Sequence, residues 1–400
     1  MSAVAFRICA FALGAFICAP AAVAQTPAAE GDWILDTRLR YESVSQDGLE
    51  DASALTLRAR VGYETPAWRG FRALAEVEGV AHLTGDFNDT VNGHTTYAIV
   101  ADPEAFELNR LQVSWTGAEG RSAVLGRQRI VLGNARFVGN VGFRQNEQTF
   151  DAARASFRPF DQTTLTYIYV DRVRRIFGDD SPQGEWESDS HIVQAEAVLP
   201  IGRITAYGLL LDFQNAPAQS SQTYGLRWQK EWEAGAYRPR LTLEMAHQGD
   251  YRGNSADFGL GYQHAEFALK RGPWGVSVGG ERLEGDDARG FSTPLATLHA
   301  FQGWADVFLT TPPDGLRDLY AGASYTTPLW PDAQPATFAV TYHDFADDGG
   351  GADFGREWDV SVRFGLSGHV SLEAKAAFFE GEDVRFADRN KFWLAIEYRL

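Results

Sequence analysis

From residue 33 to the end of the chain, apolar and polar residues alternate with a period of two, and this pattern most constrains the fold. In the first segment Trp33, Leu35 and Leu39 share one face. Asp36 and Arg38 share the other. Successive side chains of a strand point to opposite faces, so the pattern predicts strands. About 18 strands are expected, most of them about ten residues long, enough for a tilted strand to cross a bilayer. They are residues 33–42, 55–64, 71–83, 108–116, 123–132, 150–157, 163–173, 191–199, 204–213, 223–232, 238–247, 258–269, 274–283, 319–326, 336–345, 357–366, 370–379 and 391–400.

The predicted connections alternate between short and long. The short ones are residues 66–70, 117–120, 200–203, 234–236, 272–273 and 367–369, and the long ones are 84–105, 174–189, 284–303 and 346–356. This layout is typical of a transmembrane, antiparallel, up-and-down β-barrel with short periplasmic turns and long extracellular loops. A secreted sandwich or solenoid would also explain the alternation, because a soluble sheet can bury its apolar face. The all-β fold class is therefore expected either way, and strand length and loop asymmetry favour the membrane barrel.

The first residues have the features of an export signal. Arg7 precedes an apolar stretch over residues 8–18, and Ala22-Val23-Ala24 fits a signal-peptidase site. A membrane anchor is the alternative, but Gly14 and Pro20 interrupt a short stretch. We therefore expect a signal peptide at 1–24, a periplasmic segment at 25–32, a barrel at 33–400 and a location in the bacterial outer membrane. Both cysteines lie within residues 1–24, so no disulfide framework is expected.

The last predicted strand places five apolar residues on one face: Phe392, Leu394, Ile396, Tyr398 and Leu400. This ending resembles the assembly signal of bacterial outer-membrane proteins, so the barrel-assembly machinery is an expected partner, together with outer-membrane lipid and lipopolysaccharide. An open sheet edge in lipid would leave backbone groups unpaired, so we expect the barrel to close.

Charge separates the possible functions. The chain carries 53 acidic and 36 basic residues, a formal net charge of −17, which argues against a nucleic-acid partner. The basic residues are 32 Arg and only 4 Lys. Many arginines fall on the face opposite the apolar one, among them Arg58, Arg60, Arg154 and Arg240. The guanidinium fork suits carboxylates and stays ionised, so these residues would favour anions in a pore. A wall of offsetting charges that keeps a wide pore wet is the alternative.

Acidic residues cluster in the predicted external loops. Examples are Asp179 and Asp180, Asp286 and Asp287, and Asp347. Such carboxylates could hold divalent cations against lipopolysaccharide phosphates or bind Ca²⁺ weakly, whereas simple solvation of exposed loops is the alternative. We assign no metal site and expect no cofactor.

One segment combines arginines with glycines. Residues 126–152 contain Arg127, Arg129, Arg136 and Arg144, and Arg154 follows closely. Its glycines permit sharp backbone excursions, so we expect a loop that folds into the pore, narrows it and sets its sign preference. The alternative is an external loop whose arginines pair with the nearby acids at 147 and 151.

Two segments resemble the alginate export family of outer-membrane porins. Residues 126–152 are similar to that family's central motif, and residues 291–306 with 311–318 are similar to its other characteristic stretch. The resemblance implies a monomeric, 18-stranded barrel with a constricted, arginine-rich lumen that passes anionic polyuronate or related carboxylate-bearing saccharides. In the second segment His299, Trp304 and Asp306 could contact the solute, although interface anchoring would equally explain Trp304.

No sequence signature indicates an enzyme. The histidines are scattered, no nucleophile motif accompanies them, and no phosphate-binding glycine loop or metal spacing occurs. We therefore expect a passive channel for anionic solutes. A closed structural or adhesive barrel with acidic loops, or an outer-membrane lipid hydrolase, is the alternative.

Overall fold

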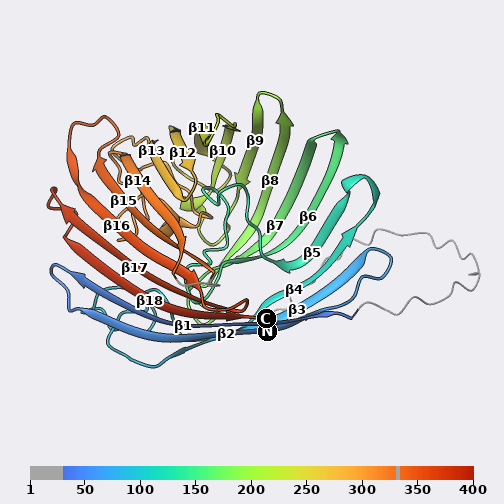
Figure 1. Cartoon of the computed structure of the whole chain (residues 1–400), viewed down its shortest axis with the longest axis horizontal. Helices are drawn as coiled ribbons and strands as arrows, with labels where there is room; N and C mark the ends of the chain where they lie inside the picture. The colour runs from blue at the N-terminus through green and yellow to red at the C-terminus, as the bar shows by residue number, and fades with distance from the viewer. Residues whose placement is uncertain (1–29, 330–333) are drawn as a thin grey trace, which may run out of the picture.

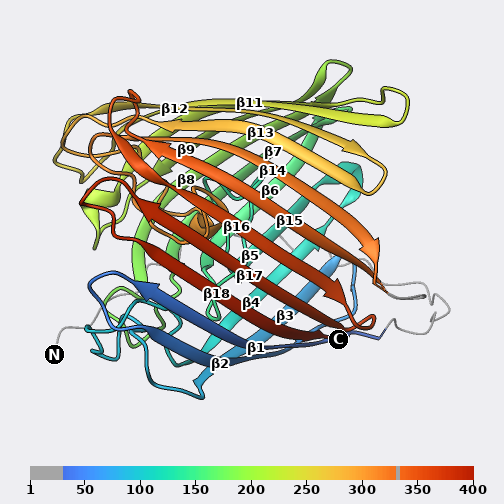
Figure 2. The same ribbon diagram turned by 60° about the vertical axis from the view of Figure 1, so that its left-hand side comes forward.

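The computed structural model describes residues 30–329 and 334–400, which form one closed antiparallel barrel of 18 strands. Each strand pairs with its sequence neighbours, and β1 (Asp32–Gln46) also pairs with β18 (Arg389–Arg399), which closes the sheet. Figures 1 and 2 show the tilted strands following one another around the barrel. The predicted fold class and strand number are confirmed.

The remaining strands follow in chain order. They are β2 (Ala52–Glu64), β3 (Phe71–His82), β4 (Ala105–Thr116), β5 (Ser122–Gln128), β6 (Thr149–Phe160), β7 (Thr163–Arg174), β8 (Glu185–Leu199), β9 (Gly202–Leu211), β10 (Ser221–Glu231), β11 (Tyr237–Asp250), β12 (Gly259–Arg271), β13 (Trp274–Leu283), β14 (Leu316–Pro328), β15 (Pro335–Ala346), β16 (Asp353–Gly365) and β17 (Val370–Gly381). In the part of the chain that the structure describes, three short 3₁₀ helices lie between strands, at Ala118–Gly120, Pro217–Gln219 and Leu298–Ala300. Among the described residues, no helix is long and apolar enough to span a membrane.

Long and short connections lie at opposite ends of the barrel. The long-loop end carries residues 83–104, 129–148, 175–184 and 284–315, and the short-turn end carries 161–162, 200–201 and 272–273. Strands β1 and β18 pair along their length, and the pair Asp36 and Arg399 places the start of β1 beside the end of β18 at the short-turn end (Figure 2). Several predicted boundaries were wrong. The loop expected at 174–189 is shorter because β8 begins at Glu185, and the loop expected at 284–303 runs on to residue 315. The loop expected at 346–356 ends at residue 352, and the strand expected at 123–132 ends at Gln128, where the connection 129–148 begins.

The described residues include the start of the barrel. Strand β1 begins at Asp32, one residue inside the segment expected to precede the barrel. The predicted signal peptide at 1–24 lies outside the described residues.

The outward face of the sheet is apolar. Trp33, Phe106 and Leu125 are 67%, 84% and 66% exposed, as expected of strand residues that face lipid. Aromatic pairs lie toward the short-turn end, with the Trp33 and Tyr63 ring centroids 5.0 Å apart. This exterior has the composition of a membrane-facing surface with aromatic residues at its border.

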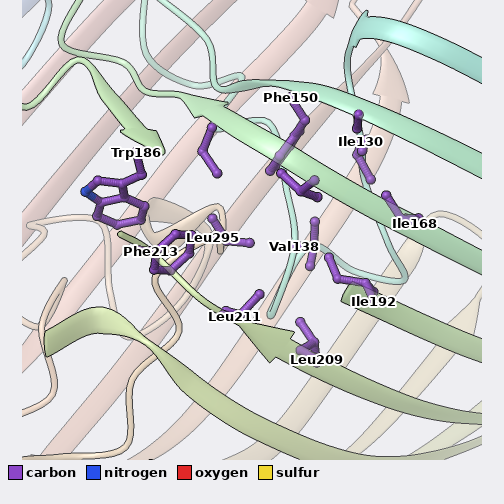
Figure 3. Packing of buried hydrophobic residues seen from close by; sticks show 13 residues of the cluster. Ile130, Val138, Phe150, Ile168, Trp186, Ile192, Leu209, Leu211, Phe213 and Leu295 are labelled. Carbon is purple, nitrogen blue, oxygen red and sulfur yellow. The ribbon is translucent and has the colours of Figure 1, made fainter. Parts of the chain in front are cut away.

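The lumen next to β6–β9 is filled by an apolar cluster. Strand residues such as Phe150, Ile168 and Leu209 pack there against Ile130 and Leu295 from two connections (Figure 3). The expectation of a polar lumen therefore does not hold on this side. Burial of these side chains anchors the two connections inside the barrel.

Candidate solute pathway

Two connections enter the barrel and join each other. Residues 129–148 and 284–315 meet where Gly139 N donates to Leu295 O at 2.8 Å and Thr297 N donates to Ala135 O at 3.0 Å. A Cβ atom on Gly139 would lie 2.2 Å from Thr297 Oγ1, so this approach requires glycine. The arginine-containing segment thus folds into the barrel, where it is visible in Figure 1.

The first inward connection, residues 129–148, is held to the wall of β1–β3. Arg38 Nε donates to Gln145 Oε1 at 2.9 Å, and the backbone N–H of Gln145 donates to Asp102 Oδ1 at 2.8 Å. Arg40 bonds Asp102 in turn. These buried charge-assisted contacts close the lumen on this side, because they fill it with paired groups.

Most of the predicted arginines are neutralised by carboxylates. Arg58 pairs with Asp36 and Glu397, and Arg60 pairs with Glu78. The other pairs are Arg127–Asp151, Arg129–Glu147, Arg136–Glu281, Arg144–Asp306 and Arg240–Glu266. Arg154, on the inward face of β6, has no ion pair within the described part of the chain. Arg58 is only 1% exposed and cannot meet a solute in this structure.

The alternative for residues 126–152 was an external loop whose arginines pair with nearby acids, and only the pairing is found. Arg127 and Arg129 do pair with Asp151 and Glu147, but the connection lies inside the barrel rather than outside it. Burial alone would raise the pKa of Glu147, but Arg60 and Arg129 outweigh burial and lower the pKa to about 2. Glu147 is therefore a permanent anion that fixes the arginines around it.

The second inward connection, residues 284–315, brings His299 and Asp306 into a buried cluster. His299 Nδ1 lies 2.8 Å from Asp306 Oδ1, and Arg144 and Lys391 bond the same carboxylate at 3.0 and 2.8 Å. Lys375 Nζ lies 2.7 Å from His299 Nε2. An ammonium group can only donate, so His299 Nε2 accepts and Nδ1 carries the proton. Burial lowers the pKa of His299 to about 3, which keeps the ring neutral.

Trp304 belongs to the same cluster. Lys375 Nζ lies 3.8 Å from the centre of the Trp304 ring, a cation–π contact inside the lumen. The interface-anchoring alternative for Trp304 is therefore wrong. The backbone amides of Trp304 and Ala305 donate to Asp359 Oδ2 at 3.1 Å and to Glu357 Oε1 at 2.7 Å. These bonds attach residues 301–306 to the inward face of β16.

Sequence reasoning missed four basic residues. They are Arg175, Arg389 and Lys391, which line a cavity in the lumen, and Lys375, which contacts His299. Among the described residues, only Lys391 of these four has a carboxylate within 4 Å. The rarity of lysine was the available signal, because two of only 4 lysines meet at one cluster. Arg175 lies 4.0 Å from the Trp186 ring centre, and burial lowers its pKa to about 10, so it stays charged at neutral pH.

A cavity of about 430 Å³, here called the outer cavity, opens toward the long-loop end. Its charged lining residues are Arg144, Arg175, Arg389 and Lys391 with one acid, Asp306. Its other walls are largely apolar and include Ile99, Val141, Ile176, Leu298 and Leu309. This combination can hold an anionic group next to an apolar body.

A second cavity of about 460 Å³, the inner cavity, lies on the other side of residues 301–306. Trp304 and Tyr320 line it together with Asp318, His343 and Asp359. Arg240 also lines it, but Glu266 neutralises this guanidinium at 2.9 Å. Residues 301–306 therefore separate a basic outer cavity from an inner cavity whose charges are mixed.

No metal centre accompanies these cavities. Across residues 30–329 and 334–400, no group of three or more His, Cys, Asp or Glu side chains is placed to hold a metal ion. The acidic residues of the external loops instead pair with arginines in places, as Asp314 does with Arg385 at 3.0 Å.

The closed barrel has the fold of outer-membrane porins. Among solved structures, OccAB4 of Acinetobacter baumannii superposes with a TM-score of 0.74 at 12% identity, covering 94% of this chain and 99% of that one. OccK9 (OpdG) of Pseudomonas aeruginosa gives 0.72 at 16%, with 93% and 99% covered. OpdK of Pseudomonas aeruginosa, solved with vanillate, gives 0.71 at 14%, with 92% and 98% covered.

These identities establish the shared fold and nothing finer. No family model matches the chain, and no curated protein matches it. The resemblance to the alginate export family therefore stays a prediction.

Proposed function

We propose that this protein is a passive outer-membrane channel for small anionic solutes, in particular carboxylates with an apolar body. The outer cavity carries the proposal, because four basic side chains face a single acid there and apolar residues form the remaining walls. Basic groups in a constricted lumen favour anions, and guanidinium groups suit carboxylates.

The unpaired cations support this function more than the paired ones do. Arg389 donates to the carbonyl oxygens of Ala305 and Asp306, both at 3.0 Å, and no described carboxylate lies within 4 Å to offset its charge. Arg175 rests on aromatic rings. Arg144, in contrast, shares its charge with Glu42 and Asp306. Vanillate, with which the structure of OpdK was solved, is a carboxylate on an aromatic ring.

The cluster around His299 would act by binding and orienting a solute rather than by chemistry. His299 is neutral and both of its ring nitrogens are occupied, so it offers no general base. We further propose that the protein is a monomer and that lipopolysaccharide surrounds its long-loop end. A polyuronate of the alginate type is the larger anion that the sequence resemblance indicates.

Reversal potentials across a planar bilayer with a KCl gradient test the proposal. We expect anion selectivity, and a cation-selective open channel would contradict the proposal. Liposome swelling then separates the solutes. Benzoate should enter faster than a uronate oligomer if small carboxylates are the substrates. A barrel that admits neither would be the closed structural barrel instead.

A further inference from the structure

A third cavity at the long-loop end has a different chemistry from the outer cavity. Its volume is about 430 Å³, and we call it the mouth cavity. It lies among the connections 175–184, 212–220, 251–258 and 284–315. It adjoins the outer cavity, with which it shares Arg175, Pro294, Leu298, Leu309 and Thr310. Hydroxyl and amide side chains alternate with apolar ones in its lining, and none of its described lining residues carries a carboxylate.

The framework of the mouth cavity is fixed by side-chain amides whose hydrogen bonds are already made within the protein. Gln248 donates to Ser292 O at 2.7 Å and accepts from Ser292 N at 2.9 Å. Asn254 donates to Ser220 O at 2.8 Å, which links two neighbouring connections. These side chains are already satisfied, so they hold the cavity in shape.

Hydroxyl groups with unused capacity remain on this framework. Ser221 is 3% exposed, and its Oγ has no hydrogen-bond partner among the described residues. Ser220 Oγ accepts from Phe213 N at 2.9 Å, and Thr293 Oγ1 accepts from Arg136 at 2.8 Å, so each hydroxyl can still donate. A buried hydroxyl without a partner is costly, and a ligand that completes its bonds gains that energy.

Aromatic faces and cationic donors complete the lining. Arg175 lies over Trp186 at 4.0 Å, and Arg289 lies over Phe258 at 4.7 Å. Neither arginine has a carboxylate within 4 Å in the described ranges, so their N–H groups can donate elsewhere. Planar guanidinium groups that rest on aromatic rings and keep N–H groups free to donate suit a ring with an apolar face and a rim of hydroxyl groups.

We infer that the mouth cavity is a saccharide-binding site that recognises ring hydroxyls, next to the anion-binding outer cavity and distinct from it in the groups that recognise the ligand. Its ligand would be an uncharged hexose or a sugar unit of similar size. The inference adds to the proposed channel and rests on the same open long-loop end, but it does not depend on anion selectivity. The free hydroxyl of Ser221 is its most specific feature.

Saturation-transfer NMR on the full barrel in deuterated detergent tests the inference with glucose as the probe. We expect saturable binding, and Ser221→Ala should weaken it by about threefold to tenfold because one hydrogen bond is lost. Folding should survive this change, since Ser221 Oγ has no partner to lose. Ser324→Ala, on the lumen wall of β14 and away from the mouth cavity, is the matched control.

Two results would overturn the inference. One is the absence of saturable glucose binding. The other is binding of glucuronate alone, which would mean that the arginines and not the hydroxyls recognise the ligand. This measurement needs no ion flow, so its failure is distinct from a loss of anion selectivity in the bilayer.

Discussion

Among single residues, the partner of each basic side chain decides what it can do in the pathway. Arg58 and Arg136 are each 1% exposed and bonded to carboxylates, so they stabilise the barrel interior. Removing one partner of a buried pair typically costs about 3–5 kcal/mol. Arg175 and Arg389 have no such partner among the described residues and remain free to attract an anion.

The double substitution Arg175→Gln with Arg389→Gln should therefore weaken anion preference while the protein still folds. The reason is that the substitutions remove two uncompensated positive charges from the outer cavity, and no buried carboxylate loses an ion-pair partner. Reversal potentials in a KCl gradient provide the measurement. Arg385→Gln is the control, because Arg385 lies in an external connection and is paired with Asp314. Equal selectivity in the double variant and the control would contradict the assignment.

His299 should make barrel stability depend on acid pH. Burial lowers its pKa to about 3 in the folded chain, whereas an unfolded histidine titrates near about 6.5. Between these values only the unfolded chain binds the proton, so stability falls as pH drops from 6.5 toward 3. The melting temperature in detergent should fall between pH 7 and pH 4, and His299→Gln should flatten that dependence. Identical pH profiles for both proteins would show that another group is responsible.

Among the elements, strands were predictable and connections only partly so. The two-residue period located every strand, because an outward apolar residue must alternate with an inward one in a barrel wall. The inward course of residues 129–148 was anticipated from glycines and arginines. Its apolar anchors were not, since Ile130 and Val138 pack against strand residues that are distant in sequence.

The candidate site was harder to predict for the same reason. Sequence indicates that Arg144 and Asp306 are charged, but only the fold shows that they lie 3.0 Å apart and neutralise each other. The segment at 291–306 did supply His299, Trp304 and Asp306. Lys375 joins them from β17, and no local pattern could have predicted this pairing.

The junction of the two inward connections should depend on Gly139. Gly139→Ala places a methyl group 2.2 Å from Thr297 Oγ1, which is itself held by Val141 N at 3.2 Å. Such overpacking should lower the free energy of unfolding by about 1–3 kcal/mol. It should also broaden the distribution of single-channel conductance values. Urea unfolding in lipid vesicles and bilayer recordings measure both effects. Gly142→Ala is the control, because its nearest neighbour is the flexible side chain of Asn140. Two variants that behaved alike would argue against a required close approach.

Across the whole molecule, charge is distributed by position rather than by total. The net charge of −17 coexists with a basic outer cavity, because many acids lie in the external connections or are paired inside the lumen. The outward face in contrast is apolar, as the exposure of Trp33 and Phe106 shows. This face determines whether the barrel is stable in lipid, whereas the proposed function assigns the choice of solute to the outer cavity.

A charge on the outward face should therefore destabilise the barrel far more than the same charge in a connection. Leu394 lies at the middle of β18, is 50% exposed and pairs with Tyr41 across the closing seam. Leu394→Arg should lower the free energy of unfolding in lipid vesicles by about 2–4 kcal/mol, the cost of arginine near the bilayer midplane.

Val384→Arg provides the control for the Leu394 substitution. Val384 lies fully exposed in the connection before β18, where the arginine meets water, and such a surface change should stay within about 0.5 kcal/mol. Both variants add one positive charge, so a difference between them isolates the environment of the side chain. If urea titrations in vesicles gave equal losses, the outward face of β18 would not be in contact with lipid, and the seam between β1 and β18 would have to be shielded by another surface.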